Sequence, residues 1–158
     1  MSSERAEFIY NRLLDQIRKA PDLFGSGRVR TWWRALADSL AFGLGQEEAP
    51  EYVELAHDTS GPLPTVAVIA IGKRAIVTAS LVLSPGSDPD YVPVTVRDFA
   101  RVASVEVGAT SSQGVPWPGV PQGIVRFDDG SELGLPLAGL WTEDPEGLQA
   151  AFRALLSR

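Results

Sequence analysis

Residues 65–83, TVAVIAIGKRAIVTASLVL, decide the fold of this chain. Two apolar runs of strand length flank the short break Gly72-Lys73-Arg74, and β-branched residues are frequent in both runs. The pattern predicts two antiparallel strands, over 65–71 and 75–83, that are joined by a tight turn. Neither run approaches the length of about 20 apolar residues that a membrane-spanning helix needs, so we expect no integral membrane segment.

A second hairpin is predicted in GIVRFDDGSELGLPL at residues 123–137, because Asp129-Gly130 suits the two turn positions that need positive φ. From Tyr52 onward the apolar residues recur with a period of two, and turn residues interrupt them at short intervals. The alternation predicts seven strands, which lie at 51–58, 65–71, 75–83, 92–96, 102–109, 123–128 and 132–138.

Helices are predicted on both sides of the strands, at 4–19, 28–42 and 145–157, where apolar residues follow the spacing of one helical face. Asp144 suits the N-cap of the last helix, and Pro145 suits its first position. The composition changes sharply after the second helix. We therefore divide the chain into an N-terminal helical appendage, residues 1–45, and a main body, residues 46–158.

The main body is expected to be an α+β fold. In this interpretation seven antiparallel strands form one strongly bent sheet or barrel, and the C-terminal helix covers its open end. This order resembles the pleckstrin-homology-like (PH-like) domain superfamily, in particular its small bacterial versions, over residues 50–158. The resemblance rests on residues 65–83, on VTVRDFARVASVEVG at 94–108, and on FDDGSELGLPL at 127–137 leading to the final helix. It implies a protein-binding module, and the pair of helices in 1–45 is an addition to that pattern.

The composition excludes several kinds of chemistry. The 158 residues contain no cysteine and one histidine, His57, which excludes disulfides, thiolate nucleophiles and sites rich in Cys or His ligands. His57 falls within a predicted strand, and no G-x-S-x-G elbow presents a serine to it, so we expect a structural role. The glycine pairs at 25–27 and 43–45 do not follow strands and are not phosphate loops. We expect no catalytic residues, no metal and no cofactor.

The charge is unevenly distributed along the chain. The net charge is −6, with seven basic and five acidic residues in 1–45 and seven basic and fifteen acidic residues in 46–158. An acidic main body argues against nucleic acid as a partner. The N-terminus has charges in every turn and no apolar core of a signal peptide, so we expect a cytoplasmic location.

Two groups of residues are candidates for binding. Lys73-Arg74 is the one basic pair of the predicted sheet, and the alternative is an ordinary solvated turn. The loop at 59–64, TSGPLP, has no basic residue, although PH-like domains that bind phosphoinositides carry theirs around this first hairpin loop; this argues against phosphoinositide binding. Trp117 lies between Pro116 and Pro118, which stiffen the loop. It serves either as an exposed recognition residue or as a plug for the open end of the sheet.

Trp32 and Trp33, in the second predicted helix, have three interpretations. The first is a membrane-surface helix with Arg28, Arg30 and Arg34, although the acidic net charge of the chain argues against it. In the second they pack inside the chain, on the sheet or on the first helix, and in the third they contact a second copy. Three functions follow from these observations. The first is a non-catalytic module that presents a groove or an edge strand to a protein. The alternative is a structural protein that self-assembles through its N-terminal helices. The third is an enzyme with an unrecognised site in the mouth of the sheet.

Overall fold

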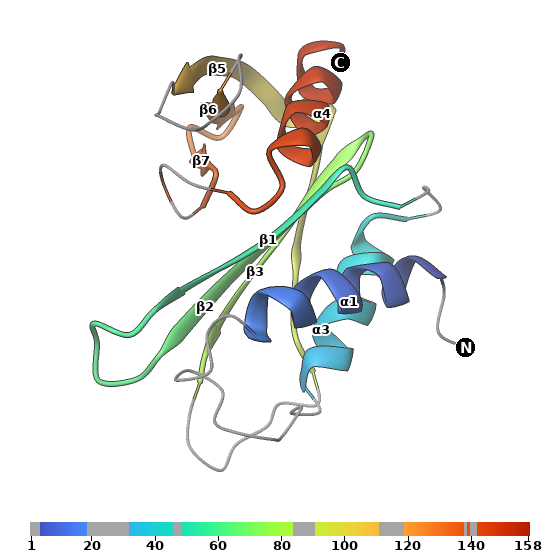
Figure 1. Cartoon of the computed structure of the whole chain (residues 1–158). Helices are drawn as coiled ribbons and strands as arrows, with labels where there is room; N and C mark the ends of the chain where they lie inside the picture. Colours follow the sequence, from blue (N-terminus) through green and yellow to red (C-terminus); the bar gives the residue numbers. More distant parts are fainter. Residues whose placement is uncertain are drawn as a thin grey trace.

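The computed structural model describes residues 4–18, 32–45, 49–83, 91–110, 119–137, 139 and 142–158. The chain is an α+β protein with its strands in two sheets, as Figure 1 shows. Its elements are, in order, α1 (Glu4–Arg18), α3 (Trp32–Gly43), β1 (Tyr52–Asp58), β2 (Thr65–Ile71), β3 (Ala75–Val82), β4 (Thr95–Asp98), the 3-10 helix η1 (Phe99–Arg101), β5 (Val102–Thr110), β6 (Val120–Phe127), β7 (Glu132–Leu135) and α4 (Pro145–Leu156).

The seven strands and the final helix occur in the predicted order, but the prediction of a single strongly bent sheet or barrel is wrong. Strands β1–β4 form one antiparallel sheet in the order β1-β2-β3-β4, and β5–β7 form a separate antiparallel sheet. The ladder stops at Asp98, because its side chain accepts a hydrogen bond from the Ala100 amide, 2.8 Å away, and caps the turn of η1. After this turn β5 pairs with β6 instead of β4.

Three strands begin or end three residues from the predicted position, and the other strand boundaries agree with the prediction within two residues. Strand β4 occupies residues 95–98 and not the predicted 92–96. Its last two residues, Arg97 and Asp98, were expected to lie in the break between two strands. Strand β6 begins at Val120, because Val120 to Gln122 continue the pairing with β5 up to Thr110. Strand β7 ends at Leu135, before Pro136, which has no amide hydrogen to donate to a ladder. The start of the second helix, predicted at residue 28, lies outside the described residues.

The four-stranded sheet carries a hydrophobic cluster on each of its faces. Side chains alternate along β2: Val66, Val68 and Ala70 belong to one cluster, whereas Ile69 and Ile71 belong to the other. Helices α1 and α3 cover the first face, and the three-stranded sheet with α4 covers the second (Figure 1). The described part of the N-terminal region therefore packs on the sheet.

A buried polar network joins β1 to the segment before α4. The hydroxyl of Tyr52 donates to the Glu54 carboxylate at 2.7 Å and lies 2.7 Å from the Thr142 hydroxyl. The backbone amide of Leu137 donates to the same oxygen of Glu54 at 2.7 Å. Glu54 and Thr142 are both buried. The partners satisfy a carboxylate that burial alone would make costly, and they hold the chain after β7 against β1.

Candidate functional site

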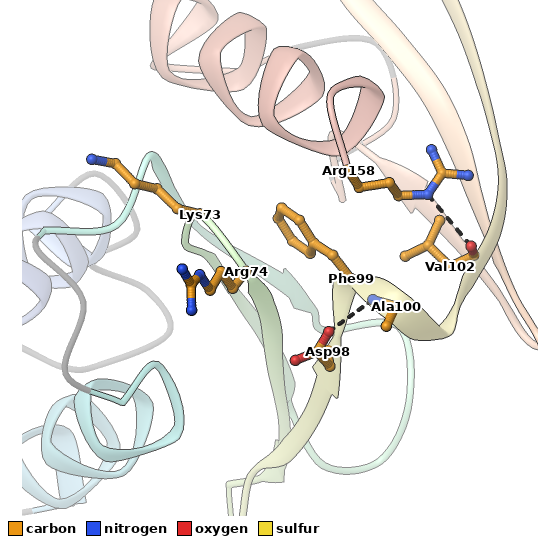
Figure 2. Close-up of a pocket in the computed structure, with 7 residues that line it drawn as sticks. All are labelled: Lys73, Arg74, Asp98, Phe99, Ala100, Val102 and Arg158. Atoms are coloured by element: carbon orange, nitrogen blue, oxygen red, sulfur yellow. Dashed lines mark hydrogen bonds between the residues drawn. The ribbon is translucent and has the colours of Figure 1, made fainter.

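A basic cleft lies where the two sheets meet. It has a volume of about 510 Å³ and lies between the turn after β2, the 3-10 helix η1 and the end of α4. The residues that line it are Lys73, Arg74, Asp98, Phe99, Ala100, Val102 and Arg158, drawn in Figure 2. We call this site the basic cleft.

Backbone pairing assembles one wall of the cleft from distant segments. The β3–β4 register places Ala75 opposite Asp98, and the Phe99 amide donates to the Arg74 carbonyl at 2.7 Å. The turn that carries Lys73 and Arg74 is thereby fixed beside η1. Phe99 itself is buried and belongs to the core cluster beneath α4.

Arg158 forms the opposite wall. Its guanidinium donates to three carbonyl oxygens, those of Leu155 at 3.0 Å, Val102 at 3.4 Å and Ala103 at 3.5 Å. These acceptors are neutral. Within the described part of the chain, neither Arg158 nor Arg74 forms an ion pair with a carboxylate. The one carboxylate of the lining, Asp98, is exposed and caps η1.

The cations do not converge on one point. Figure 2 shows the side chains of Lys73 and Arg74 extending on one side of the Phe99 ring, and Arg158 on the other side. Separated cations with an aromatic ring between them suit an extended anionic ligand better than one compact anion. The side chains of the described lining are three cations, one carboxylate, one aromatic ring and two small apolar groups.

A second, shallow depression of about 520 Å³ lies on the three-stranded sheet. Gly108, Gly134 and Gly139 contribute to it, and nothing lies within 4 Å of the position that a Cβ atom would take at each. Beside it, Arg126 bridges Glu106 at 3.2 Å and Glu132 at 2.9 Å. The hydrogen bond to Glu106 is the main cause that holds the pKa of Arg126 above its ordinary value. Arg126 on β6 is therefore paired with carboxylates on both neighbouring strands, β5 and β7.

The outer edge of β5 is the third feature of this region. Among the described strands, β5 has a neighbour on one side only, in the sheet order β5-β6-β7. Arg158 occupies the carbonyl oxygens of the first two residues, Val102 and Ala103. Beyond them the strand continues to Thr110, and its side chains are mostly exposed. The basic cleft opens at the start of this edge, since Val102 and Arg158 belong to both.

The structure brings together only some of the residues singled out from the sequence. Lys73 and Arg74 lie together at the cleft. Trp32 and Trp33 are buried in the core beneath α1, with ring centroids 4.0 Å apart. Because both side chains are buried, they have almost no exposed surface with which to contact a second copy. Pro116, Trp117 and Pro118 lie outside the described residues.

His57 lies in β1, as expected, and is exposed. Among the residues that the structure describes, no group of three or more His, Asp or Glu side chains is placed to hold a metal ion. Sequence reasoning missed Phe99 and Arg158 as parts of the cleft. No local pattern marks them, because only the β3–β4 register and the packing of α4 bring them to the Lys73-Arg74 turn.

No helix in the described ranges is long and apolar enough to cross a membrane. Comparison with known proteins found no family model, no curated protein and no solved structure that matches this chain.

Proposed function

We propose that this chain is a non-catalytic protein interaction module with a PH-like architecture, and that it binds an extended segment of a partner along the outer edge of β5. Seven antiparallel strands followed in sequence by a closing helix support the architecture, since that order is the basis of the resemblance. The open edge of β5 is the observation that carries the binding mode.

The four edge strands of the two sheets differ in what they offer to a partner. Strands β4 and β7 have four residues each, and β1 has seven. The outer edge of β1 is occupied, because the Gln16 amide donates to the Val53 carbonyl at 3.1 Å and accepts from the Leu55 amide at 2.6 Å. Strand β5 has nine residues, and beyond the Arg158 contacts no described strand or side chain pairs with its outer edge. Proteins usually shorten or cover such edges, so a long open one favours recognition of another strand.

The backbone groups at the outer edge of β5 determine which kind of partner can bind there. Backbone amides and carbonyls of β5 supply hydrogen bonds to any extended segment, whatever its side chains. Val107, 45% exposed, provides an apolar contact beside the edge. The partner is therefore expected to be a flexible segment with high β-propensity rather than a preformed helix.

The test begins with selection of binders from a displayed library of random peptides of about 16 residues, long enough to span the strand and both ends. Hydrogen exchange with a selected peptide should slow at the amides of 102–110. Val107→Lys should weaken binding about tenfold, because lysine on an edge opposes strand addition. Val96→Lys is the matched control: Val96 lies on β4 and is 48% exposed. Failure to select any peptide, or protection that avoids β5, would contradict the proposal.

Self-assembly is the second candidate, and the same edge favours it, because β5 of another copy is itself an extended strand. Helices α1 and α3 give it less support, since Leu13, Trp32, Leu36 and Leu40 of their apolar faces are buried inside the chain. Light scattering over a range of concentrations separates the candidates. A monomer at every concentration would end the second one.

A further inference from the structure

We propose that the basic cleft selects an acidic stretch at one end of the segment that pairs with β5. This inference rests on the proposed function and names the chemistry of the partner. It joins two features that share residues: an open strand edge and a cluster of cations at the point where that edge begins.

Continuity of the two surfaces is the first step. Val102 is the first residue of β5 and also lines the cleft. Arg158 lines the cleft and reaches the carbonyl oxygens of Val102 and Ala103. A segment that pairs with β5 from Ser104 onward and continues past Ala103 therefore reaches Arg158 first and then the wall that carries Arg74.

Charge is the second step. The chain has a net charge of −6, so a site with three cations and one carboxylate is locally opposite to the rest of the molecule. The neighbouring Arg101 is paired with Asp128 at 3.4 Å and contributes little charge. The donors of Arg158 bind neutral carbonyls only. Carboxylates of an incoming segment would therefore give Arg74 and Arg158 charge-assisted hydrogen bonds that no described carboxylate gives them.

The spacing of the cations is the third step. Lys73 and Arg74 extend from the turn on one side of Phe99, and Arg158 extends on the other (Figure 2). A peptide with acidic residues at separated positions can reach both walls, whereas a single phosphate group would contact one wall only. We therefore assign the cleft to an acidic protein segment and not to a lipid headgroup or free phosphate.

The experiment compares the amino-acid composition of peptides selected by four proteins from the same random library. Wild type should enrich peptides with Asp and Glu clustered at one end. The exposed double variant Lys73→Ala/Arg74→Ala, and separately Arg158→Ala, should lose that enrichment. Arg153→Ala is the matched control, because Arg153 is an exposed arginine of α4 that does not line the cleft; it should select as wild type does.

Affinities of one selected peptide give the size of the effect. Each cation removed should weaken binding about two- to fivefold, the range of an exposed ion pair. Replacing the acidic residues of the peptide by Asn and Gln should have a similar effect in wild type and a smaller one in the double variant, which keeps Arg158. Binding should weaken as ionic strength rises from about 0.05 M to about 0.3 M.

Three outcomes would overturn the inference. Selected peptides that protect β5 but show no acidic preference would contradict the role of the basic cleft, while binding along β5 would remain supported. Selection of no peptide at all would remove both. Binding to inorganic phosphate, or to phosphatidylcholine vesicles with about 5 mol% phosphatidylinositol 4,5-bisphosphate, that is lost in the double variant while acidic peptides fail to bind would assign the cleft to phosphate instead.

Discussion

The hydroxyl of Tyr52 connects the central sheet to the segment that precedes the final helix. Its ring is buried, and its hydroxyl donates to Glu54 and contacts Thr142. Burial, and secondarily the negative charge of Glu54, raises the pKa of Tyr52. A single oxygen atom thus stabilises a buried carboxylate and fixes the position of the chain before α4.

Tyr52→Phe should lower the free energy of unfolding at pH 7 by about 1–3 kcal/mol, since the buried Glu54 loses a donor. Urea denaturation measures this. Tyr91→Phe is the control, because Tyr91 is 79% exposed, and it should change stability little. An effect of Tyr52→Phe no larger than that of the control would show that the network contributes nothing.

The same residue predicts a response to alkaline pH. Its pKa is raised on folding, so the folded chain keeps a proton that the unfolded chain loses above about pH 10. This contribution to stability is complete below that pH and decreases as pH rises toward the raised pKa of the folded state. Between about pH 9 and pH 11, wild type should therefore lose more unfolding free energy than Tyr52→Phe. Equal losses in denaturation at the two pH values would contradict this.

Gly123 shows how one missing side chain lets elements approach. A Cβ atom at this position would lie 2.2 Å from the Glu106 carbonyl oxygen and 2.7 Å from the Phe152 ring of α4. Gly123→Ala should lower the free energy of unfolding by about 2 kcal/mol or more, because the helix must shift. Gly134→Ala on β7 meets open space and should be close to neutral. Thermal unfolding of both variants checks the difference, and similar losses would contradict it.

At the scale of elements, α1 covers the edge of β1 through one side chain. The carboxamide of Gln16 supplies a donor and an acceptor as a neighbouring strand would. The outer edge of β1 is covered because α1 carries a glutamine at residue 16. Among the described residues, the outer edge of β1 is covered by Gln16, whereas that of β5 has no partner beyond Arg158.

Gln16→Glu tests this covering. The substituted carboxylate keeps an acceptor for the Leu55 amide but loses the donor to the Val53 carbonyl, so stability should fall by about 1 kcal/mol. The opened edge should also promote association, measured as scattering at high concentration. Asn11→Asp is the control, because Asn11 is exposed on the same helix. Association in the control as well would point to a general effect of charge.

At the scale of the whole molecule, the four-stranded sheet couples the two hydrophobic clusters, because its strands contribute side chains to both. Because β2 sends alternate side chains to opposite faces, loss of packing on one side disturbs strands that the other side needs. The helices of residues 1–45 and the sheet of residues 46–158 share one hydrophobic cluster, so we expect them to unfold together.

Leu36→Ala in α3 and Leu148→Ala in α4 should each lower the free energy of unfolding by about 2–5 kcal/mol, since both side chains are fully buried. Each variant should unfold in one transition, with tryptophan fluorescence and far-UV circular dichroism coincident. Two separate transitions, with Leu36→Ala affecting only the first, would instead show that the appendage is an independent domain.

Local periodicity was sufficient for the order of the helices and strands and for their positions to within about three residues, because burial on one face of an element leaves a repeat of 3.6 or 2.0 residues in the chain. It also identified Lys73 and Arg74, which lie in a turn that two apolar runs define. The same patterns did not distinguish one bent sheet from two, since an antiparallel strand has the same alternation in either arrangement.

Only the tertiary structure decided what lies at the cleft and along β5. Asp98 ends one ladder through a hydrogen bond to its own turn, and the register of β4 on β3 then places Phe99 beside Arg74. Arg158 joins them because α4 packs across the second cluster. Sequence by itself determined which segments form elements; the pairing of residues far apart in the chain, which periodicity does not encode, determined which edge stays open and which charges meet.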